Sequence, residues 1–184
     1  YPIDAATSER GAGLYKEYCA ACHGVGARDF SGEYVGKVTP VAEIGTDRRR
    51  LDSYTYDLAA NQSTLYAGYD WRFKSFRKTH GYANMPLDGL WLRGPYLHNG
   101  SVPAVRDLLE PAAARPKTFY RGNDVYDPVR VGFVSNIPAE GGRKFFVYDT
   151  TVPGNGNGGH EGKRYGTELS DADKDALVEY LKTF

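Results

Sequence analysis

The sequence is short of the residues that usually build metal clusters and membrane spans. Its 184 residues include two cysteines and one methionine, and no apolar run approaches the length of a transmembrane helix. Arginine and lysine together number 23, as do aspartate and glutamate, so no net charge favours nucleic acid or an anionic membrane. We therefore expect no nucleic-acid partner and no transmembrane segment.

Both cysteines fall in one motif, Cys19-Ala20-Ala21-Cys22-His23, which has the form C-x-x-C-H. Two thiols at this spacing can each add across a vinyl group of one porphyrin, and the histidine that follows can ligate the iron. Zinc would need a second pair of Cys or His residues at ligand spacing, and a redox dithiol does not require the histidine. The motif predicts one covalently bound haem c with His23 as the proximal ligand; a chance match is the alternative.

The sixth iron ligand has two candidates. Met85 is the only methionine and precedes Pro86, which favours an extended loop conformation. A thioether on such a loop suits a distal haem ligand, although Met85 can also be a packing side chain against the porphyrin. His98 is the second choice. His80 is most simply a surface residue, and His160 follows a loop so rich in glycine that it can hold a ligand only if the loop folds against something.

Two further positions have a possible supporting role at a haem. The carbonyl of Pro40 can accept a hydrogen bond from the second ring nitrogen of His23, or Pro40 is an ordinary turn proline. One guanidinium of Arg48-Arg49-Arg50 can pair with a haem propionate, or the run is a solvated face.

Apolar periodicity predicts helices at both ends of the chain. Residues 7–18 read as a helix that begins at Thr7 or Ser8, and Ser170 caps a closing amphipathic helix. Gly11 and Gly13 would let these two helices approach closely. A third helix is predicted over residues 51–66, with its apolar stripe facing the haem or the core, and two helical turns over residues 103–110. The runs TFYR, VRVGFV and RKFFVY predict a small antiparallel sheet.

The helix leading into CAACH, the methionine on a later loop and the closing helix ending in YLKTF resemble a class I c-type cytochrome over residues 8–90 and 168–184. This resemblance implies a small all-helical haem fold with His23 and Met85 as axial ligands. The segment GPYLHNGSVP and its surroundings look like the cytochrome domain of rubber-oxygenase-like and dihaem-peroxidase-related proteins. Those relatives typically carry two C-x-x-C-H sites, whereas this chain has one, which favours the electron-transfer half of such a protein.

The predicted fold class is mainly α: a class I cytochrome c-like helical haem domain with a large loop-rich insertion that carries a small antiparallel β element. We expect one cytochrome c domain over residues 1–184, with its haem core in residues 7–92 and 166–184 and the insertion over about 93–165.

A six-coordinate haem has no open position for a substrate, so we expect a monohaem electron-transfer protein and not an enzyme. Its partners would be redox proteins such as a dehydrogenase, an oxidase or another cytochrome. The alternative is a haem enzyme of peroxidase or oxygenase type with an open or displaceable distal site. Haem attachment of this type occurs outside the bacterial cytoplasm, and the chain begins with Tyr1. We therefore expect a periplasmic or extracytoplasmic protein whose signal or tethering segment has been removed.

Overall fold

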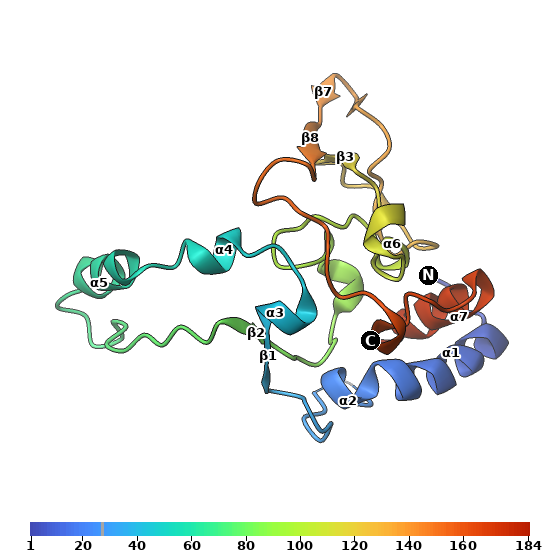
Figure 1. Cartoon of the computed structure of the whole chain (residues 1–184). Coiled ribbons are helices and arrows are strands. Elements are labelled where there is room, and N and C mark those ends of the chain that lie inside the picture. The colour runs from blue at the N-terminus through green and yellow to red at the C-terminus, as the bar shows by residue number, and fades with distance from the viewer. Residues whose placement is uncertain (27) are drawn as a thin grey trace.

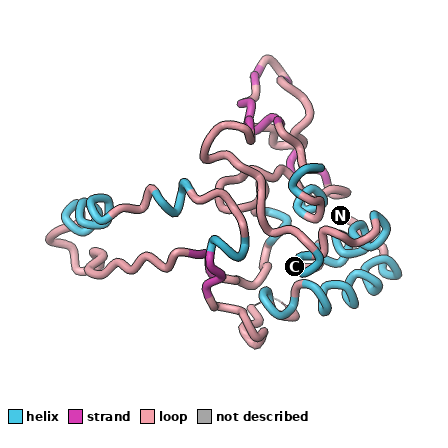
Figure 2. The backbone as a smooth tube through the Cα atoms, viewed as in Figure 1, coloured by secondary structure: helices cyan, strands magenta, loops and turns pink. Residues whose placement is uncertain are grey.

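The computed structural model describes residues 1–26 and 28–184. Figure 1 shows the two terminal helices at one side of a body, a lobe of short strands above it, and an arm that carries α4 and α5 away from it. Figure 2 shows that loops and turns form most of the path between these elements.

The chain begins and ends in helices. Helix α1 (Ala5–Tyr18) begins after Asp4, whose carboxylate accepts a hydrogen bond from the Thr7 backbone N–H at 2.7 Å. It therefore starts earlier than predicted. Helix α7 (Asp171–Leu181) is capped by Ser170, as predicted, because the Ser170 hydroxyl accepts a hydrogen bond from the Asp173 N–H. These caps satisfy donors that each helix start would otherwise leave unpaired.

Helices α1 and α7 pack closely because Gly11 has no side chain. A Cβ atom at Gly11 would lie 2.0 Å from the carbonyl oxygen of Ala176, so only glycine fits this crossing. The Tyr15 ring packs on the Phe184 ring, with 4.9 Å between their centroids, and Leu177 is completely buried beside them. The predicted contact between the terminal helices is confirmed for Gly11, whereas Gly13 does not lie at the crossing. The contact fixes the C-terminal end of α1, which leads into CAACH.

Short elements follow α1 along the chain. Helix α2 (Ala20–His23) continues directly from α1. Strand β1 (Val38–Pro40) pairs antiparallel with β2 (Gly81–Ala83), with Val38 opposite Ala83, and α3 (Val41–Ile44) follows β1. This strand pair joins the two ends of the arm to the body.

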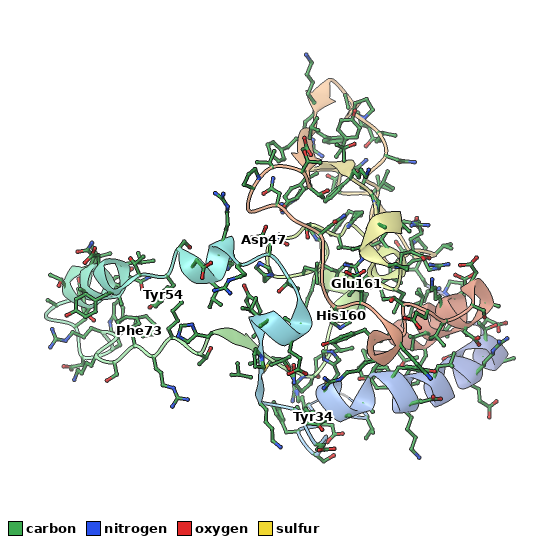
Figure 3. The ribbon with its side chains drawn as sticks, viewed as in Figure 1. Tyr34, Asp47, Tyr54, Phe73, His160 and Glu161 are labelled. Atoms are coloured by element: carbon green, nitrogen blue, oxygen red, sulfur yellow. The ribbon has the colours of Figure 1, made fainter. Side chains whose placement is uncertain are left out.

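The arm differs from the prediction. In place of one helix over residues 51–66, the chain forms α4 (Arg49–Asp52) and α5 (Tyr56–Leu65), and neither contains a buried residue. Leu65 is 73% exposed, so the predicted apolar stripe does not face a haem or a core. The reason is that the arm folds back on itself: Tyr54 contacts Phe76 of the returning segment, and Tyr54 and Phe73 lie far from the body in Figure 3.

The middle of the chain forms short elements around a small apolar core. Val102, Val105 and Val131 are among its most deeply buried residues. Strands pair antiparallel as β3 with β8, β4 with β5, and β6 with β7, so the predicted antiparallel β structure is present as three separate pairs. The bounds are η1 (Leu90–Leu92), α6 (Val105–Leu108), η2 (Ala112–Ala114), β3 (Thr118–Arg121), β4 (Tyr126–Asp127), β5 (Gly132–Phe133), β6 (Ala139–Glu140), β7 (Arg143–Lys144), β8 (Phe146–Asp149) and η3 (Lys163–Tyr165).

The predicted mainly α fold class is wrong. Helix accounts for 33% of the chain and strand for 14%, and the sheets are small. The physical reason lies in the middle of the sequence, where glycine and proline recur too often for long helices and aromatic runs pair as short strands. The fold is a mixture of helices, strand pairs and long loops.

Gly11 and Gly13 of α1 provide a matched test of the packing between α1 and α7. Gly11→Ala should lower the free energy of unfolding by about 1–3 kcal/mol, because the added methyl group meets the backbone of α7. Gly13→Ala should raise it by up to about 1 kcal/mol, because nothing lies within 4 Å of its Cβ position and alanine favours the helix. Denaturant unfolding of the purified variants measures both changes. Equal changes in the free energy of unfolding would contradict the close approach of α7 to α1 at Gly11.

Candidate haem-binding site

A single cavity gathers the motif residues. It holds about 1250 Å³ of empty space, its open mouth included. Helix α2 forms one wall, and the segment that contains His160 contributes to another. Aliphatic side chains from the middle and the end of the chain complete the lining: Leu87, Leu90, Val105, Leu108, Leu109 and Leu181. The cavity therefore suits a mostly apolar ligand.

The two cysteines both line this cavity. Cys19 ends α1, and the backbone N–H groups of Cys22 and His23 donate to its carbonyl oxygen at 3.1 and 2.9 Å. Both thiols are free. Burial, with a smaller contribution from Cys22, raises the pKa of Cys19 to about 12. Its thiol is therefore protonated at neutral pH. Neither cysteine stands in a cluster of three or more His, Cys, Asp or Glu side chains that could hold a metal ion, within the residues described.

His23 is oriented by a backbone carbonyl. Its Nδ1 lies 2.8 Å from the carbonyl oxygen of Met85, so Nδ1 carries the proton and Nε2 is left free to bind a metal. Burial lowers the pKa of His23, which keeps the ring neutral, although the hydrogen bond to Met85 opposes this shift. The supporting role predicted for Pro40 is wrong, because the carbonyl at Nδ1 belongs to Met85 and Pro40 instead precedes α3.

Met85 touches His23 through its backbone. The carbonyl contact lies at Nδ1, the ring nitrogen that is not free for iron, and the residue is 48% exposed. The Met85 side chain is not among the groups that line the cavity. His98 is also set apart: its ring stacks on Tyr82 with 4.6 Å between centroids, and of the two only Tyr82 lines the cavity. The structure therefore brings together Cys19, Cys22 and His23, but neither predicted distal side chain.

The residue that faces His23 is His160. The two ring centroids are 6.4 Å apart with their planes at 45°, and His160 lines the same cavity. Burial, with smaller contributions from the nearby His23 and Arg115, lowers the pKa of His160 to about 4. The ring is therefore a neutral imidazole at neutral pH, which is the form that binds a metal. Its Nδ1 is buried and has no hydrogen-bond partner among the residues that the structure describes.

The glycine-rich loop before His160 does fold against the body. A Cβ atom at Gly159 would lie 2.4 Å from the Thr46 backbone nitrogen, and the His160 N–H donates to the Ile44 carbonyl at 2.8 Å. Figure 3 shows His160 at the centre of the molecule, on the segment that returns from the strand lobe. The run of glycines was the signal in the sequence, because glycine permits this close backbone approach.

An arginine also lines the cavity, but it is not one of the three predicted. Arg164 forms an ion pair with Glu43 and lies over the rings of Tyr34 and Tyr165, at 5.6 and 5.9 Å from their centroids. Of the predicted run, Arg48 pairs with Asp52 at 3.3 Å, and none of the three arginines lines the cavity. Arg164 is therefore the guanidinium best placed to meet an anionic group at the cavity wall.

Comparison with known proteins finds a described family whose model matches part of the chain. Residues 81–120 match the family described as RoxA-like, cytochrome c-like. The uncharacterized proteins y4iJ and y4iM of Sinorhizobium fredii (strain NBRC 101917 / NGR234) are 41% identical over 144 residues and 32% identical over 224 residues. These alignments cover 75% and 100% of this chain, but 23% and 50% of the relatives. The chain thus spans half or less of the length of these relatives.

The middle of the chain is therefore RoxA-like and cytochrome c-like, which confirms the predicted resemblance for this region. The matched residues build much of the cavity wall, including Tyr82, Leu90 and Leu108. They also supply the Met85 carbonyl that orients His23. A region of this kind indicates a haem-binding cytochrome.

The residues at the site fit a haem group. Two metal–nitrogen bonds of about 2 Å, with roughly 1 Å from each ligating nitrogen to its ring centre, span about 6 Å. The observed 6.4 Å between His23 and His160 matches one metal ion held between two imidazoles. The apolar lining suits the porphyrin faces, and both cysteines open onto the same space.

Replacing the thioether of Met85 tests whether its side chain ligates the iron or only its backbone contributes to the site. Met85→Leu should leave the absorption spectrum of the haem-loaded protein unchanged, because the contact with His23 is made by the backbone. His23→Ala is the positive control and should abolish a stable haem-loaded protein. Loss of a weak sulfur-to-iron absorption band in Met85→Leu would instead support Met85 as the sixth ligand.

The structure bears on the expectation of no transmembrane segment through its helices. Among the described residues, no helix combines the length and the apolar character that a bilayer crossing requires.

Proposed function

We propose that this chain is a monohaem c-type cytochrome that carries single electrons, with the haem attached at Cys19 and Cys22 and its iron held between His23 and His160. The observation that carries the proposal is the 6.4 Å separation of the two imidazole rings across the cavity. The cytochrome c-like match of residues 81–120 supports the haem part of the proposal.

The bound haem would supply a reversible one-electron couple between ferric and ferrous iron. The chain would set the conditions for that couple. Cys19 and Cys22 would hold the group through thioether bonds, and the Met85 carbonyl keeps His23 in the tautomer that presents Nε2. Neutral His160 closes the opposite face. With the iron held by His23 and His160, the chain would leave no position for a substrate at the iron.

Two imidazole ligands favour a lower reduction potential than an imidazole and a thioether would. The apolar lining works in the opposite direction, because a water-poor cavity disfavours the extra positive charge of ferric iron. As an electron carrier, the protein would exchange electrons with redox proteins, such as a dehydrogenase, an oxidase or another cytochrome, over a small transient interface. We infer an extracytoplasmic location, since covalent haem attachment of this type takes place there.

The second candidate is a haem enzyme of oxygenase or peroxidase type, and the RoxA-like match of residues 81–120 is the observation that favours it. Such an enzyme needs an open or displaceable distal position. Treating the ferrous protein with carbon monoxide separates the two functions. An electron carrier closed by His160 should keep its spectrum, and rapid formation of a carbon monoxide complex would favour the enzyme.

Removing His160 tests the proposed axial pair. His160→Ala should convert the ferric protein from low-spin to high-spin, because the distal imidazole is lost, and added imidazole should restore the low-spin spectrum. His98→Ala is the matched control, since His98 stacks on Tyr82 behind the cavity wall, and it should keep the low-spin spectrum. A low-spin spectrum in His160→Ala would show that another side chain is the ligand.

The covalent attachment has its own test. The Cys19→Ser and Cys22→Ser single variants should each retain haem on a denaturing gel stained for haem, because one thioether remains. The double variant should release all of its haem to acidified acetone. Haem that stays bound to the double variant, or wild-type protein that releases its haem, would contradict attachment through these cysteines.

A further inference from the structure

Arg115 is buried in an unusual way for an arginine. It follows η2, is only 2% exposed, and has no carboxylate within ion-pair distance among the residues described. Burial lowers the pKa of Arg115, and the charges of Glu161, Asp107 and Glu110 oppose this shift from a distance. A buried charge is costly unless its donors are paired, so the bonds that Arg115 makes must compensate for that cost.

All of the bonds made by the guanidinium go to backbone carbonyls. Nε donates to Glu110 at 2.9 Å, and one Nη2 bond reaches Leu108 at 3.2 Å. The other three bonds reach a single loop: Nη1 donates to Asn157 and, at 2.9 Å, to Gly159, and Nη2 donates to His160 at 3.2 Å. Five bonds match the five N–H groups of arginine, and a lysine has only three. The side chain thus ties residues 157–160 to the end of α6.

Other contacts also hold this loop and the residues just before it. The His160 N–H donates to Ile44 at the end of α3, and the Asn99 side-chain amide donates to the Gly154 and Gly156 carbonyls at 3.1 and 2.9 Å. His160 itself has a φ of +50°, which an L-residue adopts only when its surroundings hold it there. Arg115 is the group that bonds to the His160 carbonyl directly.

We propose that Arg115 is a positioning residue for His160: its guanidinium holds the carbonyls of residues 157–160 so that the imidazole stays opposite His23. The proposal rests on the proposed function, because it assigns Arg115 a role in keeping the distal ligand in place. The bonds that Arg115 makes to Glu110 and Leu108 anchor the loop to α6, which itself lines the cavity through Val105 and Leu108.

Substitutions of Arg115 in the haem-loaded protein test this role. Arg115→Met should give a mixed-spin ferric spectrum and raise the rate of carbon monoxide binding to the ferrous protein by at least about tenfold, since charge-assisted hydrogen bonds to the loop are lost. Added imidazole should return the spectrum to low-spin. Arg115→Lys keeps the charge but has fewer donors, and its rate should lie between those of Arg115→Met and the wild type.

A control separates positioning from general destabilisation. Arg130→Met removes the ion-pair partner of the buried Asp107 without touching the 157–160 loop, so it should lower stability and leave the spectrum and the carbon monoxide rate unchanged. If Arg115→Met does not accumulate as folded protein, Arg115→Lys decides the question. Folded Arg115 variants with the wild-type spectrum and rate would overturn the proposal.

His160→Ala distinguishes this inference from the proposed function. If His160→Ala stays low-spin, the axial pair itself is wrong. If His160→Ala becomes high-spin while the Arg115 variants behave like the wild type, only the positioning role of Arg115 fails.

Discussion

Two imidazole rings 6.4 Å apart impose the main constraint on this molecule. They belong to residues far apart in the sequence, and the space between them can be kept only if both backbones are held firmly. His23 is held by its own helix and by the Met85 carbonyl. His160 lies in a loop, so its position depends on contacts with other parts of the fold. The structure supplies these contacts from α3 on one side and from Arg115 on the other.

The packing of the terminal helices supports the position of His23. Because Gly11 allows α7 to approach α1 closely, the C-terminal end of α1 lies against a buried core. Cys19 directly follows that end. The arm has the opposite character, since α5 contains no buried residue and Tyr54, just before it, contacts Phe76 of the returning segment. Stability is therefore concentrated around the cavity, and the arm is expected to open more readily than the body.

The parts of the site that the sequence predicted are those encoded by neighbouring residues. C-x-x-C-H needs only five consecutive positions, and the caps and apolar faces of α1 and α7 are equally local. The position of His160 could not be predicted in this way, because it depends on Gly159 packing against Thr46 and on five carbonyls meeting one guanidinium. Met85 has the residue type of a haem ligand, and in the structure its backbone carbonyl makes the contact with His23. The mainly α fold class is wrong for a related reason: β1 pairs with β2, and β3 with β8, across long stretches of chain, and local propensity does not reveal such pairing.

The central claim is that a histidine, and not a methionine, lies opposite His23 in the haem-loaded protein. Near-infrared magnetic circular dichroism of the ferric wild-type protein measures this directly, because the ligand-sensitive charge-transfer band differs in position between two imidazoles and an imidazole with a thioether. We predict the band of a bis-imidazole haem. A band typical of imidazole and thioether ligation, or the spectrum of a high-spin haem with an open position, would contradict the account.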